Sequence, residues 1–321
     1  MTFKKIYGII RFGAQNARQI FIINSVKNMK RISVSLKAKI AILAATLIWG
    51  ISFCFMKSSL DEVPPNMILA LRFSGASLLL AIVFFKRLKY TNLQYIFKGG
   101  LLGLFLYLAY LFQTLGLEDT TPGNNAFLTA IYCIIVPFLY WIIKRKRPDA
   151  FNFIAAFICI TGMGFISLTN SFTIGKGDLL TMIGGFMYAV HLFFVSEFTK
   201  DKDAILLTLF QFIFSAIFSW IAFLFTETAP TSISSDAIWQ LIFLSLIATG
   251  VALLLQNIGQ KYTTPQTASI LLSLESVFGA LFSIILGYDL ITGQKIIGFA
   301  LIFIAVIVSE TKLSFLLPKK K

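Results

Sequence analysis

The residues best able to do chemistry are a few charged and polar side chains placed inside long apolar runs. Glu275 lies near the middle of the run 266–286, which is long enough to cross a bilayer, since a spanning helix needs about 20 apolar residues. A carboxylate at that depth is costly, so it is expected to face a partner or a wet cavity rather than lipid. Two interpretations are open: a cavity group that binds a cation or takes up a proton, and a structural group hydrogen-bonded to a neighbouring helix.

Arg72 is a cation in a similar position, about six residues inside one end of the apolar run 66–85. It can hold a substrate carboxylate through two parallel hydrogen bonds. It can equally extend back to the membrane interface or form a fixed bridge with Glu275. We favour a structural or gating role for Arg72.

Five further side chains at mid-span depth are candidates for a solute cavity: Tyr132, Trp49, Tyr188, His191 and Gln211. Aromatic groups can stack on an amphipathic solute and hydrogen-bond to it, although helix packing explains Trp49 and Tyr188 equally well. His191 is the single histidine and can relay protons, but a buried histidine with satisfied hydrogen bonds is the simpler interpretation. Gln211 is a buried amide that we expect to bond to backbone near a turn.

The composition indicates that membrane-spanning helices position these residues. Hydrophobic residues make up 57% of the chain and charged residues only 13%, whereas soluble domains carry about 25% charged residues. The three cysteines each fall inside an apolar run with no paired spacing, so they indicate packing rather than a disulfide framework. The sequence therefore predicts an all-α integral membrane protein.

About ten spans are expected, with short turns between them. The apolar runs are 38–56, 66–85, 95–115, 125–143, 151–168, 179–198, 204–225, 237–259, 266–286 and 291–309. All but four of the 28 Lys and Arg fall on one side of this predicted topology, and this bias places both termini in the cytoplasm. The net charge of +14 therefore indicates membrane topology and contact with lipids in the cell membrane, not a nucleic-acid partner.

An internal repeat divides the chain into two halves. The segments QTLGLEDTTP (113–122) and QNIGQKYTTP (256–265) share five of ten residues at an offset of 143, which pairs Tyr132 with Glu275. An offset of 139 pairs Arg72 with Gln211 earlier in each half. Five spans per half is an odd number, so the second half enters the membrane from the opposite side. Inverted repeats of this kind are typical of secondary transporters with a site at the membrane midplane.

We divide the chain accordingly into four parts. Two repeats of five helices cover 37–168 and 178–310, and a basic tail covers 311–321. The basic segment 1–36 has two open interpretations: an amphipathic stretch resting on an anionic leaflet, and a translation start at Met29, which we favour.

The ordered motifs are similar to those of EamA-type members of the drug/metabolite transporter superfamily. The residues that carry this resemblance are LIWGISF (47–53), LRF (71–73), GLEDTTPGNNAFLTAIYCIIVPFLYWII (116–143) and YTTPQTASILLSLESVFGALFSIILGYDLITGQKIIG (262–298). One departure is the all-basic KRKRP (144–148), where Gly-Glu-Arg-Pro is common in the family. The resemblance implies a ten-span carrier of small metabolites that works by alternating access, and export of amino acids or related solutes is our expectation.

Enzyme chemistry finds little support in the sequence. The chain has no phosphate-binding G-x-x-x-x-G-K-[ST] segment and no clustered His, Asp or Glu within a span, so we expect no catalytic residues, cofactor or metal site. We expect a small-molecule solute as partner, with protons as possible coupling ions. A membrane channel and an intramembrane lipid-modifying enzyme remain the alternatives.

Overall fold

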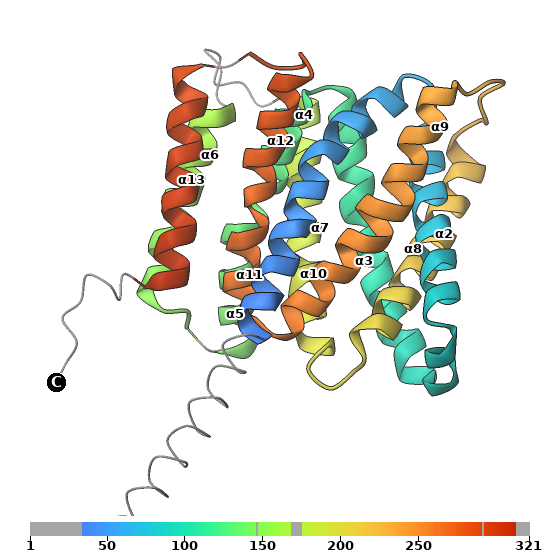
Figure 1. Cartoon of the computed structure of the whole chain (residues 1–321), viewed down its shortest axis with the longest axis horizontal. Helices are drawn as coiled ribbons and strands as arrows, with labels where there is room; N and C mark the ends of the chain where they lie inside the picture. Colours follow the sequence, from blue (N-terminus) through green and yellow to red (C-terminus); the bar gives the residue numbers. More distant parts are fainter. Residues whose placement is uncertain (1–33, 146, 168–174, 291, 313–321) are drawn as a thin grey trace, which may run out of the picture.

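The computed structural model describes residues 34–145, 147–167, 175–290 and 292–312, and these are helical without strands (Figure 1). In chain order the elements are Val34–Leu60, α2 (Pro65–Val83), η1 (Phe85–Tyr90), α3 (Leu93–Glu118), α4 (Pro122–Thr129), α5 (Tyr132–Lys144), α6 (Ala150–Ser167), α7 (Lys176–Phe198), α8 (Ala204–Thr226), α9 (Ser235–Ile242), η2 (Phe243–Val251), α10 (Ala252–Lys261), α11 (Pro265–Leu272), α12 (Leu274–Ile285) and α13 (Gly293–Thr311).

Eight helical segments in the described part of the chain are long and apolar enough to cross a membrane. Three of them combine consecutive elements, namely α4 with α5, α9 with η2 and α10, and α11 with α12. α6 and α13 hold shorter apolar stretches, so the ten-span count stays a prediction. The predicted start at Met29, nearly all of the basic segment 1–36 and the tail beyond 312 lie outside the described residues.

The two segments that share the Thr-Thr-Pro motif begin their helices in the same way. Thr121 accepts a hydrogen bond from the backbone N–H of Asn124 at 3.3 Å, and Thr264 accepts one from Thr267 at 3.2 Å. In both cases proline follows as the first helical residue, where its missing N–H costs nothing. The repeated motif therefore begins a helix in the same way at both positions, in α4 and in α11.

Both of these helices are then interrupted at matching positions. α4 ends at Thr129 and α5 begins at Tyr132, while α11 ends at Leu272 and α12 begins at Leu274. The residues at the interruptions, Ala130 and Ser273, are 143 positions apart, the offset of the repeat. Tyr132 and Glu275 therefore each lie in the first turn that follows a break.

Elements at matching positions also pack against each other. α2 packs on α8 and α6 packs on α13, while the two interrupted helices pack crosswise, α12 on α4 and α11 on α5. The rings of Phe73 and Phe212 are 6.3 Å apart, and those of Trp49 and Tyr188 are 6.2 Å apart. Each ring pair joins two residues separated by the 139-residue offset. Such self-matching contacts are what an approximate two-fold axis between two halves would produce.

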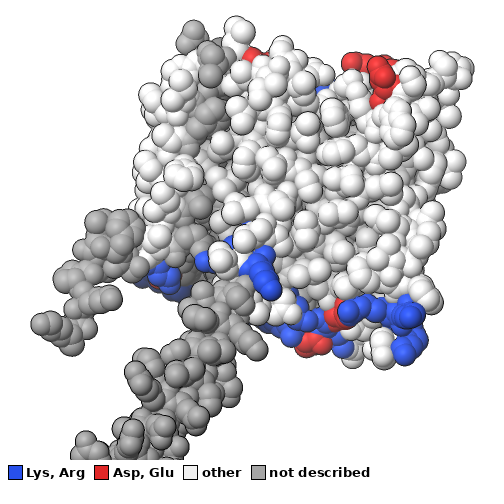
Figure 2. Space-filling view, in the orientation of Figure 1, with Lys and Arg blue, Asp and Glu red and all other residues white. Residues whose placement is uncertain are grey.

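Charged side chains gather at the two ends of the helix bundle, and nearly all of the basic ones lie at one end (Figure 2). Figure 2 shows a band of Lys and Arg along one edge and acidic side chains at the opposite edge, with an uncharged surface between them. Arg87 pairs with Asp203, Lys98 with Asp201 and Lys144 with Glu197 at the basic end. The middle surface exposes large apolar side chains, including Phe157 on α6 and Ile217 on α8. This distribution suits a protein whose sides contact lipid.

A carboxylate ties two loops together at the end opposite the basic band. Glu62, which follows the first described helix, accepts hydrogen bonds from the backbone N–H and the hydroxyl of Ser234, each at 2.7 Å. The Ser234 backbone N–H, followed by its hydroxyl, holds the pKa of Glu62 below its usual value. Glu227 similarly accepts hydrogen bonds from the backbone N–H groups of Asn66 and Met67, at 2.9 and 3.2 Å. These bonds connect the first and second parts of the chain.

Candidate functional site

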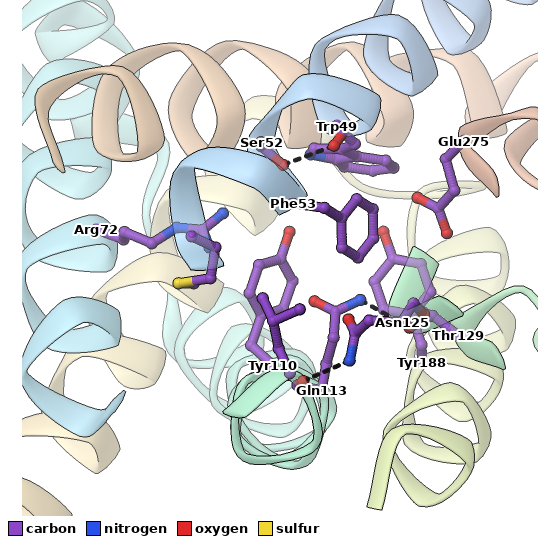
Figure 3. A pocket seen from close by; sticks show the side chains of 12 residues that line it. Trp49, Ser52, Phe53, Arg72, Tyr110, Gln113, Asn125, Thr129, Tyr188 and Glu275 are labelled. Atoms are coloured by element: carbon purple, nitrogen blue, oxygen red, sulfur yellow. Dashed lines mark hydrogen bonds between the residues drawn. The ribbon is translucent and has the colours of Figure 1, made fainter. Parts of the chain in front are cut away.

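A central cavity lies between the first described helix and α2, α3, α4, α7 and α12 (Figure 3). Both polar and aromatic side chains line it. The lining residues are Trp49, Ser52, Phe53, Met56, Arg72, Tyr110, Gln113, Leu117, Asn125, Thr129, Tyr188 and Glu275. Four of the seven site residues predicted from the sequence are therefore together in one place, and they come from helices far apart in the chain.

Arg72 is buried at one side of this cavity, with only 3% of its surface exposed. Its Nε donates a hydrogen bond to Thr249 Oγ1 at 3.0 Å, and its guanidinium lies 4.8 Å from the centre of the Tyr110 ring. Among the described residues no carboxylate forms an ion pair with Arg72, so the fixed bridge to Glu275 is not formed here. A buried cation held by a hydroxyl and a ring is able to accept an anionic group.

The π-helical segment η2 supplies the support behind Arg72. Its wider turn lets Thr249 donate to the Leu244 carbonyl at 2.7 Å while its oxygen accepts from Arg72. The Ala248 carbonyl in the same segment accepts a hydrogen bond from Trp49 Nε1 at 2.7 Å. π-helical turns often occur at functional sites, because they redirect polar groups out of the ordinary helical ladder. Here the segment fixes one charged residue and one aromatic residue of the cavity wall.

Glu275 lies on the opposite side of the cavity in Figure 3 and is also 3% exposed. Within the described part of the chain its Oε1 atom has no hydrogen-bond partner. A buried polar atom without a partner costs about 1–3 kcal/mol, and more when it is charged. The first turn of α12 therefore presents a carboxyl oxygen that a ligand N–H or a proton would satisfy.

Tyr188 connects the cavity to the residues behind it. Its hydroxyl donates to Gln256 Oε1 at 2.6 Å, and its ring lies 5.3 Å from that of Tyr132 and 5.7 Å from that of His191. His191 Nε2 is 3.1 Å from Gln211 Oε1. Tyr132, His191 and Gln211 are fully buried and do not line the cavity, so they form a layer behind it.

Several cavity residues were not among the sequence-based candidates. Gln113, the first residue of the repeated motif, lines the cavity while its Nε2 donates to Thr129 Oγ1 at 3.0 Å. Asn125 donates to the Gln113 carbonyl at 2.9 Å, and Tyr110 precedes Gln113 by one helical turn. The signal that could have found them is spacing, because Tyr110 with Gln113 and Asn125 with Thr129 share helix faces.

The cavity is narrow in this conformation. Its free space would hold about one or two water molecules. A bound metabolite would therefore require the surrounding helices to separate. The structure thus holds the polar groups of the site close together, with little open volume between them.

Comparison with known proteins gives a consistent result over nearly the whole chain. The model of the EamA-like transporter family matches residues 36–168 and 175–311. An uncharacterized transporter from Archaeoglobus fulgidus is 31% identical over 278 residues, which is 85% of each chain. The uncharacterized transporter YyaM from Bacillus subtilis is 25% identical over 288 residues, or 84% of this chain and 92% of that relative.

A solved structure has a similar fold. A crystal structure of a protein with 17% sequence identity matches this chain with a TM-score of 0.73, covering 88% of this chain and 99% of the other. At that identity the likeness concerns the fold alone.

Proposed function

This chain belongs to the EamA-like transporter family and is a multi-pass membrane protein, and from this we propose that it exports small zwitterionic solutes, amino acids or close relatives, by alternating access. The transporter class follows from the family and from the relatives named as transporters. The outward direction rests on the family resemblance. The solute class rests on the chemistry of the central cavity.

One observation carries the solute assignment: a buried cation and a buried carboxyl group line the same cavity without pairing with each other. Arg72 is supported by Thr249 and Tyr110, whereas Glu275 has an oxygen without a partner in the described part of the chain. Desolvating a charge without a partner is costly, so each group is best satisfied by a ligand of opposite charge. A solute with both a carboxylate and an ammonium group satisfies both at once.

The cavity suggests how such a solute would be held. Arg72 would accept the carboxylate, since a guanidinium can donate two parallel hydrogen bonds to it. Glu275 would accept the ammonium group from the first turn of α12. The rings of Trp49, Tyr110 and Tyr188 would contact the solute's side chain. These assignments give Arg72 a substrate-binding role in place of the structural or gating role favoured from the sequence.

Alternating access is supported by the repeated architecture. The matching helix breaks, the shared Thr-Pro starts and the paired contacts Phe73–Phe212 and Trp49–Tyr188 favour two halves of inverted topology. The cavity lies where these halves meet and is almost closed. Rocking of one half against the other would open it to each side in turn.

Two further assignments belong to this proposal. The basic band in Figure 2 favours an orientation in which that end of the protein, and both termini, lie on the cytoplasmic side of the cell membrane. Glu275 is the group through which proton movement would be coupled to transport, since it alternates between binding the solute's ammonium group and binding a proton.

Counter-flow in proteoliposomes tests the proposed function. Vesicles loaded with one unlabelled amino acid at millimolar concentration should transiently accumulate the same labelled amino acid above its outside concentration. A carrier gives saturable counter-flow, because both solutes use one site. Flux that rises linearly with concentration without counter-flow would indicate a channel, and a modified lipid product would indicate an enzyme; either result would refute the carrier assignment. Nucleosides and sugar phosphates serve as control solutes and should give no accumulation.

A further inference from the structure

A second concave surface lies on the outside of the bundle, between α3 and α8 and away from the central cavity. Apolar side chains from both helices line most of it, including Leu93, Phe97 and Leu104 on α3 and Phe214 and Phe218 on α8. Leu93 is 79% exposed and Phe97 is 73% exposed. Large apolar groups left uncovered in this way favour an apolar occupant.

The groove has the length of one leaflet's hydrocarbon. Its α3 wall runs from Leu93 to Leu104, which spans roughly 16 Å at the helical rise of 1.5 Å per residue. Half of a bilayer's apolar core is about 15 Å thick. Gly100 forms part of the wall, and a Cβ atom placed there would contact the Phe214 ring at 3.6 Å without reaching backbone. The Phe214 ring thus packs directly over Gly100, and a bulky side chain at this position would project into the groove.

Cations gather at one end of this groove. Lys98 is one of its lining residues, and Lys202 donates to Gln94, which also lines it. The preceding segment η1 contains Lys86, Arg87 and Lys89 between exposed apolar residues. Figure 2 shows basic side chains gathered along this edge of the molecule.

Two carboxylates offset only part of this charge. Asp203 pairs with Arg87, and Asp201 lies 3.4 Å from Lys98 with 62% of its own side chain exposed. Because the Lys98–Asp201 pair is long and open to solvent, an incoming anion can share Lys98. The mouth of the groove therefore carries a net positive charge.

We propose that this groove binds an anionic phospholipid from the leaflet at the basic end of the protein. One acyl chain lies along Phe97, Gly100 and Phe214, and the head-group phosphate contacts Lys98 and Lys202. An apolar groove whose polar end is cationic matches the two parts of such a lipid, and basic groups beside a membrane attract anionic lipids. A zwitterionic lipid would use the apolar wall alone, whereas free phosphate would use only the cationic mouth.

Native mass spectrometry of the full chain in detergent tests this inference. The probes are palmitoyl-oleoyl phosphatidylglycerol and palmitoyl-oleoyl phosphatidylcholine at equal concentration. We expect phosphatidylglycerol adducts to exceed phosphatidylcholine adducts by about tenfold or more, since each lysine near the head group contributes about fivefold. Equal adducts of the two lipids would overturn the proposal.

Three variants locate the site. Lys98→Gln with Lys202→Gln should reduce the preference for phosphatidylglycerol to about one, and Gly100→Trp should remove the bound lipid by filling the groove. The control is Lys144→Gln with Lys312→Gln, which removes the same charge from the basic end at positions paired with Glu197 and Asp149; it should retain the preference. Unchanged lipid binding in the first two variants would contradict the assignment.

A thermal-shift measurement separates the remaining occupants. Phosphatidylglycerol should raise the unfolding midpoint of the wild-type chain by mass action, whereas inorganic phosphate at the same concentration should not. An equal rise with inorganic phosphate would show that the mouth binds anions without a lipid. A dimer that dissociates in Gly100→Trp would show that a second copy of the chain covers the groove. Each of these two results would overturn the lipid proposal.

Discussion

The two interrupted helices have the same backbone design and different chemistry. In α4–α5 the first turn after the break carries Tyr132, a neutral phenol in the layer behind the cavity. In α11–α12 the matching position carries Glu275, which lines the cavity and has an oxygen without a partner in the described part of the chain. The same backbone arrangement thus places a carboxyl group in the cavity wall at one break only.

A second matched pair shows the opposite asymmetry. Arg72 on α2 lines the cavity, whereas its counterpart Gln211 on α8 bonds to His191 behind it. The first part of the chain therefore supplies the cation and the second part the carboxylate. Two similar halves can therefore build a site for an asymmetric solute, because each half carries one charged residue that the matching position of the other half lacks.

Glu275→Gln should have the largest effect on transport. Of the two residues that follow the helix breaks, Glu275 alone lines the cavity. Its replacement should therefore reduce accumulation driven by a pH gradient to background in proteoliposomes, while counter-flow remains measurable. Tyr132→Phe is the matched control at the other break. The Tyr132 hydroxyl forms no hydrogen bond in the described part of the chain, so Tyr132→Phe should change flux by no more than about fivefold. Proton-driven accumulation that persists in Glu275→Gln would show that the asymmetry between the breaks has no role in coupling.

Thr249→Val should give an intermediate effect. The repeat offset of 143 matches Thr249 with Leu106, so the hydroxyl that supports Arg72 belongs to one part of the chain alone. Its loss leaves Arg72 Nε without that acceptor, and hydrogen bonds to charged groups contribute about 1.5–3 kcal/mol. We expect the Kd for carboxylate-bearing solutes to rise at least about tenfold, measured by titration in detergent. Thr249→Ser keeps the hydroxyl and should bind as wild type does; equal losses in both variants would point to packing instead.

Glu62→Gln should have the smallest effect, and a pH-dependent one. The hydrogen bonds from Ser234 lower the pKa of Glu62, so the ionised group stabilises the folded state above the usual glutamate pKa. That stabilisation is lost as pH falls through the lowered value. The unfolding midpoint of Glu62→Gln should therefore lie about 1–2 °C below wild type at pH 7 and coincide with it in stronger acid.

Asp61→Asn removes a neighbouring charge and is the control for this change, with no expected shift in the midpoint. A Glu62→Gln difference that stays constant with pH would mean that the carboxylate is not what ties the two loops.

The sequence was informative where the signal was a charge or a repeat. A carboxylate and an arginine inside apolar runs predicted Glu275 and Arg72, and both line the cavity. The Thr-Thr-Pro repeat indicated equivalent segments, and the structure shows that each starts a helix in the same way. A charged residue inside an apolar run and a repeated motif can both be recognised in a single sequence.

The helix breaks and the remaining cavity residues could not be predicted from the sequence. Neither Ala130 nor Ser273 is a helix breaker, and the π-helical segment containing Thr249 has no glycine or proline before Gly250. Helices that are apolar on every side also hide which face turns inward, because lipid and protein interior favour the same residues. Tyr110 and Asn125 could therefore be assigned only from three-dimensional packing.

The most direct measurement compares three ligands in the wild type, Arg72→Gln and Glu275→Gln, by thermal shift and titration in detergent. The ligands are the amino acid with the strongest counter-flow, the amine that lacks its carboxylate, and the acid that lacks its ammonium group. If the two charged residues hold opposite ends of the solute, the wild type prefers the amino acid by about tenfold or more over either analogue. Arg72→Gln should then bind the amino acid and the amine equally, and Glu275→Gln the amino acid and the acid equally. Discrimination that is unchanged in both variants would contradict the zwitterion site.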